Sequence, residues 1–210
     1  MKGIKQKQIS DLGKGINVFT VARGTMIADN EVMDGWNCWS VGKNSIAKRP
    51  GVVKFATISG VDQIDGLGTY YDGGTRKLLA MAGGTLYDIS DGTATAVPGD
   101  VSGTDDVWTP KLRTDFVQAG GKLFISNGTD TLRYYDGTKV YTQSNGVIGK
   151  YMVYYKYCLW ICGNPDSANQ TRLYRSGSDD KIGDFTYDAS TNPLATSVYV
   201  SKDDGQILKG

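Results

Sequence analysis

The stretch "LLAMAGGTLYDISDGT" at residues 78–93 decides the fold of this chain, because its pattern returns later in the sequence. Two apolar runs are separated by Gly-Gly and followed by Asp-Gly-Thr, which is typical of a β-hairpin. The stretch "KLFISNGTDTLRYYDGT" at residues 122–138 has the same order. One offset of 45 residues aligns Lys77 with Lys122, Gly83 with Gly128 and Asp91 with Asp136. The chain therefore contains an internal repeat.

A repeat of this length, built from short strands and Gly and Asp turns, is the signature of β-propeller blades. A looser third copy lies at residues 155–180, and "GLGTYYDGGT" at residues 66–75 is interpreted as the end of a preceding blade. Stacked sheets bury the apolar faces that one sheet leaves open. We expect six residues to lie on inner strands and to pack between neighbouring sheets, namely Leu78, Leu79, Leu123, Phe124, Leu159 and Trp160. A β-sandwich with similar hairpins is the alternative.

The sequence predicts two regions. Residues 1–56 lack strict alternation and are expected to form an extended N-terminal arm, with one short helix over residues 26–37. The stretch "RPGVVKF" at residues 49–55 predicts a turn followed by a strand. Residues 57–210 are expected to be propeller blades. Three copies are fewer than the four that a ring needs, so we expect further blades in a longer polypeptide or in another chain.

The ionisable residues exclude several kinds of chemistry. The formal net charge is +1, which argues against a surface that coats nucleic acid, and Lys2, Lys5 and Lys7 are interpreted as a solvated tail. Histidine is absent, which removes the commonest general base and metal ligand. Of the 22 acidic residues only Glu31 is a glutamate. We therefore predict no catalytic residues.

The remaining candidates for a chemical site are aspartates in loops. Candidates such as Asp105, Asp106, Asp179 and Asp180 lie in turn-rich stretches and are interpreted as turn residues. The stretches "SNGTDT" at 126–131 and "SGSDDKIGD" at 176–184 lack the ligand order of an EF-hand. No phosphate-binding glycine motif opens a helix. We expect no metal and no cofactor.

Cysteine and hydropathy give little further direction. We expect Cys38, Cys158 and Cys162 to be reduced thiols, and a disulfide between the last two is disfavoured because strand neighbours four apart are too distant. No apolar run is long enough for a membrane span, and the first residues lack a secretory signal. The 13 tyrosines leave open a face that binds sugar or a partner protein.

The N-terminal region resembles virion proteins of tailed bacteriophages, namely tail nozzle or hub components and related tail-stabilising proteins, in which such a leader precedes β-propeller repeats. The matching residues are 15–17, 27–31, Asn37, Gly42 and 48–51, and the stretches "RLYRSGSDDKIGDFTY" and "DDGQILKG" resemble later blade elements. The resemblance implies a structural protein of the tail that is not an enzyme and forms a ring around the tail axis. DNA would pass only through its channel.

From the residues and this resemblance, we expect an all-β, partial β-propeller that acts by subunit assembly in the virion tail, after assembly in the host cytoplasm. Its partners would be further copies in a ring, for which a hexamer is one option, and portal, adaptor or other tail proteins. The arm would dock through Ile16, Val18, Trp36 and Trp39, and Arg49 would make a bidentate contact or be an exposed charge. The alternatives are a carbohydrate- or receptor-binding propeller, one that cleaves carbohydrate, and a scaffold domain of a cellular protein.

Overall fold

The computed structural model describes residues 38–40, 46–100 and 107–200. The chain divides into two compact units, Met1–Lys54 and Phe55–Gly210, which are described separately. In the first unit, β1 (Cys38–Ser40) pairs antiparallel with β2 (Ile46–Lys48), and Trp39 lies opposite Ala47.

The second unit contains three four-stranded antiparallel sheets, in each of which consecutive strands are neighbours. The first sheet consists of β3 (Gly66–Asp72), β4 (Thr75–Ala82), β5 (Thr85–Asp88) and β6 (Thr95–Ala96). The second consists of β7 (Asp115–Ala119), β8 (Lys122–Ser126), β9 (Arg133–Tyr135) and β10 (Val140–Thr142). The third consists of β11 (Tyr151–Tyr155), β12 (Cys158–Cys162), β13 (Arg172–Arg175) and β14 (Thr196–Tyr199).

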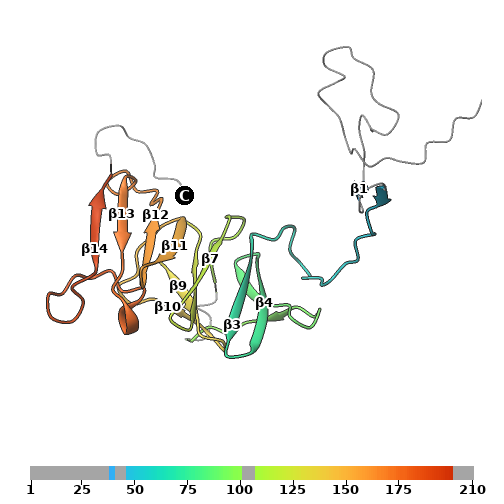
Figure 1. Ribbon diagram of the computed structural model, residues 1–210, viewed down its shortest axis with the longest axis horizontal. Helices are drawn as coiled ribbons and strands as arrows, with labels where there is room; N and C mark the ends of the chain where they lie inside the picture. Colours follow the sequence, from blue (N-terminus) through green and yellow to red (C-terminus); the bar gives the residue numbers. More distant parts are fainter. Residues whose placement is uncertain (1–37, 41–45, 101–106, 201–210) are drawn as a thin grey trace, which may run out of the picture. The chain divides into compact units, whose positions relative to one another are not determined.

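The prediction of an all-β protein is confirmed. The helix in the described part is one 3-10 turn, η1 (Asp179–Lys181), and none of the described helices could cross a membrane. The three sheets follow one another in chain order, and β7 lies beside both β3 and β11 (Figure 1). The first strands of the three sheets are therefore the ones that meet.

Two apolar cores lie between the sheets. In the first core, Leu79 and Met81 of the first sheet pack with Leu123 and Ile125 of the second. In the second core, Phe124 packs with residues of the third sheet, including Leu159 and Ile161. Because Leu123 and Phe124 are adjacent in β8, they point to opposite faces. The second sheet thus buries both of its faces.

Three expectations from the sequence need correction. The leucine-rich segments are the second strand of each sheet, not the inner one, since the first strands meet. The stretch at residues 66–75 does not end a preceding unit, because the turn at Gly73 and Gly74 joins β3 directly to β4. Residues 49–55 form no strand, and Val52 and Val53 are exposed there. No described strand pairs with these residues, so their backbone groups gain no ladder hydrogen bonds.

Candidate assembly faces

Leu79, Phe124 and Trp160 occupy equivalent positions in the three sheets. Each lies on the second strand, opposite Gly68, Val117 and Val153 respectively on the first strand. Leu79 and Phe124 are fully buried because each packs on the next sheet. Trp160 is only half-buried. Within the described part of the chain, the third sheet therefore carries an apolar face on which no further sheet packs.

This third-sheet open face consists of Val153, Tyr155, Trp160, Leu173 and Val198, which strand register places on one side. Val153 is 56% exposed and Tyr155 is 57% exposed. The residue equivalent to Tyr155 in the first sheet is Tyr70, which is only 3% exposed. The difference in exposure between Tyr155 and Tyr70 indicates how much apolar surface a further sheet packed on this face would cover.

Trp160 is held in place on this face. Its indole N–H donates to the Tyr155 carbonyl at 3.1 Å. The Arg175 guanidinium lies 5.6 Å from the ring centroid, and Arg175 Nε donates to the Leu194 carbonyl at 2.6 Å. A fixed aromatic ring on an exposed face loses little conformational entropy on binding, which suits an anchor at an interface.

The first sheet has an open face on its other side. We define the first-sheet open face as Ile64, Leu67, Leu78 and Ala80, together with Phe55, Ile58 and Ile89. These residues line an apolar hollow of about 360 Å³. Leu67 is 63% exposed, although its equivalents Phe116 and Met152 are partly buried against the preceding sheet. The described chain therefore has one open face at each end of its row of sheets.

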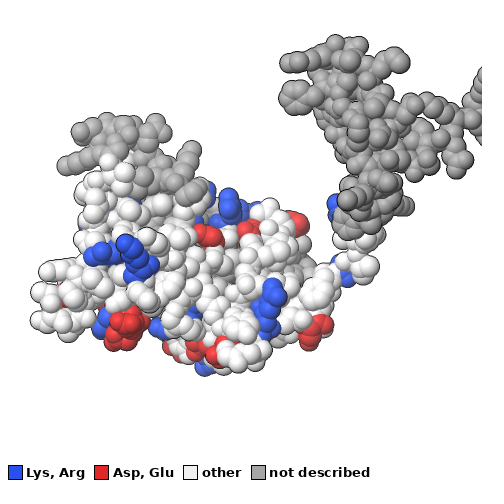
Figure 2. Space-filling view, in the orientation of Figure 1, with Lys and Arg blue, Asp and Glu red and all other residues white. Residues whose placement is uncertain are grey.

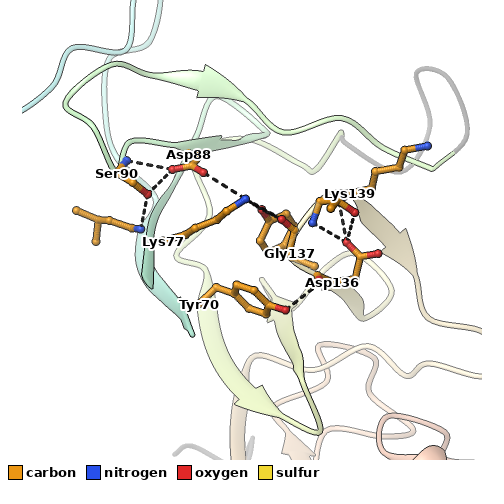
Figure 3. A network of polar contacts seen from close by, with 10 residues as sticks. Tyr70, Lys77, Asp88, Ser90, Asp136, Gly137 and Lys139 are labelled. Carbon is orange, nitrogen blue, oxygen red and sulfur yellow. Dashed lines mark hydrogen bonds and ion pairs between the residues drawn. The ribbon is translucent and has the colours of Figure 1, made fainter. Parts of the chain in front are cut away.

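A polar network clamps the first sheet to the second (Figure 3). Lys77 Nζ of β4 donates to Tyr135 Oη at 2.9 Å and to the Gly137 carbonyl at 2.7 Å. It also lies 3.7 Å from Asp88 Oδ2 in its own sheet. Tyr70 Oη donates to the Asp136 carbonyl at 2.9 Å. The Asp-Gly-Thr turn of the second sheet thus receives a lysine and a tyrosine from the first.

The turn itself is braced by the carboxylate of Asp136. Asp136 Oδ1 accepts hydrogen bonds from the N–H groups of Thr138 at 2.7 Å and Lys139 at 2.8 Å. Burial raises the pKa of Asp136, but these hydrogen bonds outweigh it and the net pKa is lowered. In the first sheet, Asp91 Oδ1 accepts from Thr93 N–H at 2.8 Å. The repeated Asp-Gly-Thr sequence therefore gives the same aspartate-to-threonine hydrogen bond twice, although residues 89–94 join β5 to β6 and residues 136–139 join β9 to β10.

The turn between β11 and β12 contains two residues other than glycine that have positive φ. In the first two sheets this position holds Gly-Gly with positive φ, but here it holds Lys156 (φ 48°) and Tyr157 (φ 63°). Side chains other than glycine are disfavoured at positive φ, at a cost of about 1–3 kcal/mol each. Tyr157 is 74% exposed at this turn. The chain presents an aromatic tip where the other sheets have glycine.

The aspartates that the sequence assigns to turns differ in their position and in their contacts. Asp105 and Asp106 lie outside the described residues, and Asp179 and Asp180 form the exposed start of η1. A small hollow of about 160 Å³ lies beside that turn. In "SNGTDT", the Asp130 carboxylate accepts from Thr109 N–H at 2.7 Å and Asn127 Nδ2 at 2.7 Å, so its oxygens brace a loop. No group of three or more metal-ligating side chains occurs among the described residues.

Cys158 and Cys162 are free thiols at the two ends of β12. Strand register places both on the same side as Trp160. Burial raises the pKa of both thiols. Cys38 lies in β1.

The interface residues predicted from the sequence lie mostly where the structure gives no description. Ile16, Val18 and Trp36 lie outside the described residues, and Trp39 is in β1. Arg49 is exposed directly after β2. Their role in docking stays a prediction.

Sequence reasoning missed Trp108, which is 2% exposed in the first core. Its backbone N–H donates to the Gly84 carbonyl at 2.7 Å, and the Arg133 guanidinium lies 4.6 Å from the centroid of its ring. A Cβ added at Gly84 would clash with the Trp108 carbonyl oxygen. A tryptophan in a segment without alternation gave no signal that it belongs to a core.

Neither the surface charge nor comparison with known proteins indicates a further site. In Figure 2, small groups of both signs are scattered over the visible face, and most of that face is uncharged. No protein family model, curated protein or solved structure matches the chain.

Proposed function

We propose that this chain is a structural subunit that acts by assembly, and that its place is the tail of a tailed bacteriophage. The observation that carries the assembly role is the pair of open apolar faces at the two ends of the row of sheets. Exposed apolar surface of this kind marks protein interfaces. The resemblance of residues 15–51 to tail nozzle and hub proteins supports the place in the tail.

The three sheets also support the narrower proposal of β-propeller blades. Each is a four-stranded antiparallel meander, and the sheets stack face to face with their first strands adjacent. Radial repetition of such sheets is the propeller arrangement, and blades beyond the three described would complete it. In this proposal the protein turns over no substrate and needs no metal or cofactor.

Immunogold electron microscopy tests the place in the virion. Antibodies raised against the full chain would be applied to tailed particles purified from the culture that produces this protein. We expect label at one fixed position along the tail. Label confined to cell debris, with none on purified particles, would contradict the proposal.

A carbohydrate- or receptor-binding module is the second candidate, and the aromatic tip favours it. Tyr157 is exposed on a turn that costs strain, and strained positions are often kept for function. A glycan array probed with the full chain tests this candidate. Binding that is lost in Tyr157→Ala or Asp179→Ala would support it, whereas no binding to any glycan would exclude it for the glycans on the array.

A further inference from the structure

We infer that the third-sheet open face of one copy binds the first-sheet open face of a second copy, so that copies join head to tail. The inference rests on the proposed assembly function, because it names the partner and the contact. Three features of the two faces support it.

The first feature is the order of the faces within the chain. The face that carries Leu79 packs on the face that carries Leu123 and Ile125. The same contact recurs between Phe124 and the face of Leu159 and Ile161. The third-sheet open face corresponds to the faces that carry Leu79 and Phe124. The first-sheet open face corresponds to the faces that carry Leu123 with Ile125 and Leu159 with Ile161. Joining them repeats an interface that the chain already contains twice.

The second feature is size. Trp160 is larger than its equivalents Leu79 and Phe124. Ala80 is smaller than its equivalents Ile125 and Ile161, and it lines the hollow of about 360 Å³. Tight packing requires that a large side chain meet a small one. The enlarged residue and the missing volume occur on the two faces that would meet, which favours a second copy over an unrelated partner.

The third feature is polar. Tyr70 Oη donates to the Asp136 carbonyl across the interface of the first two sheets. Tyr155 is the equivalent of Tyr70 on the third-sheet open face, and Asp91 is the equivalent of Asp136 at the 45-residue offset. The turns at Asp91 and Asp136 have the same internal hydrogen bond. Tyr155 would therefore donate to a backbone carbonyl in the turn around Asp91 of the second copy.

Such a contact is heterologous, because it joins two different faces. This property allows a complementation experiment with the full chain. Leu67→Asp blocks the first-sheet open face, and Val153→Asp blocks the third-sheet open face. Both residues are more than half exposed in the single chain, so we expect each variant to fold. Tyr187→Asp, at a 65% exposed residue in the loop that follows η1, is the matched control.

Light scattering after size exclusion gives the mass of each sample. We expect the unchanged chain and Tyr187→Asp to exceed the 22.7 kDa of one copy. Each blocked variant alone should remain at one copy, since every contact would include a blocked face. An equal mixture of the two should rise to about twice 22.7 kDa, because one contact has two intact faces. Tyr155→Phe keeps both faces apolar and should weaken association about fivefold through one lost hydrogen bond.

The other results separate the inference from the proposed function. Assembly that survives both blocked variants would overturn the head-to-tail contact while leaving an assembly role in place. Loss with Val153→Asp alone, without rescue by mixing, would mean that like faces meet, and would also overturn it. A chain that stays at one copy at about 100 µM, well above a micromolar dissociation constant, would overturn it as well. Immunogold label on tails would then still support the place in the virion.

Discussion

Lys77 and Tyr135 lie on different sheets, 58 residues apart, and Lys77 Nζ donates to Tyr135 Oη at 2.9 Å. The same ammonium also reaches the Gly137 carbonyl, so one side chain joins the first sheet to a turn of the second (Figure 3). The position equivalent to Lys77 is Lys122 in the second sheet and Cys158 in the third. The clamp is thus specific to the first pair of sheets.

Replacing this lysine should lower stability. Lys77→Met keeps much of the apolar stem but removes the two hydrogen bonds to the second sheet, and we expect a loss of about 1–2 kcal/mol in the free energy of unfolding. Lys122→Met is the control, because Lys122 lies 4.3 Å from the centroid of Tyr134 in its own sheet and should cost less than 1 kcal/mol. Urea unfolding followed by fluorescence measures both. Equal losses would contradict the clamp.

Alkaline pH should weaken the same contact. The hydrogen bond to Tyr135 raises the pKa of Lys77 above its ordinary 10.5, and burial raises the pKa of Tyr135 above 10.0. In the folded state both groups therefore hold protons that the unfolded chain has begun to release. The stabilisation is present below about pH 10 and is lost as pH rises through the folded pKa values. Urea midpoints should fall more steeply above pH 10 in the unchanged chain than in Lys77→Met with Tyr135→Phe.

The close approach of β3 and β7 depends on Gly68. A Cβ added there would lie 2.7 Å from the Phe116 ring. Gly68→Ala should therefore cost about 1–3 kcal/mol through overpacking, and Phe116→Leu in the same chain should recover part of it. Gly51→Ala, which meets nothing within 4 Å, is the control. Thermal unfolding checks the set, and a Gly68→Ala variant as stable as the control would refute the close contact.

The strained turn gives a reciprocal prediction. Lys156→Asn with Tyr157→Gly should raise the free energy of unfolding by about 1–2 kcal/mol, because Asn-Gly adopts positive φ readily. Gly73→Lys with Gly74→Tyr, at a turn with open space around it, should lower the free energy by a similar amount. Unfolding in urea measures both pairs. If neither pair shifts the transition, the turn carries no strain.

The thiols report on the third-sheet open face. Burial raises the pKa of Cys158 and Cys162, so at pH 8 both should alkylate more slowly than an unshifted thiol, and faster as pH rises. Peptide mapping after iodoacetamide treatment distinguishes them from Cys38. If copies join at this face, labelling of Cys162 should slow as protein concentration rises. In Leu67→Asp the rate should not depend on concentration, and equal dependence in both chains would argue against coverage of this face.

Much of the fold follows from local sequence. Gly83 and Gly128, together with the two Asp-Gly-Thr turns at the same offset, predicted the hairpins, since these residues supply positive φ and bracing side-chain oxygens. The first strands were harder. Gly66 and Gly68 weaken the apolar alternation of β3, and their reason appears only when Phe116 lies across them. A contact between two sheets cannot be predicted from the alternation of apolar residues within one strand.

The candidate faces could be predicted only in part. The sequence placed the apolar pairs of β4, β8 and β12 between sheets, and Leu79 and Phe124 are buried there. Trp160 lies on the side of the third sheet on which no further described sheet packs. The local sequence pattern of β12 does not indicate this. Tyr135 and Lys77 likewise meet through tertiary packing alone.

We propose that these sheets are completed by like-shaped neighbours from further copies. The most direct measurement is sedimentation equilibrium of the full, unchanged chain from about 1 to 100 µM, a range that spans micromolar affinities. We expect a mass that rises with concentration to at least twice 22.7 kDa. A mass that remains at 22.7 kDa over the whole range would contradict it.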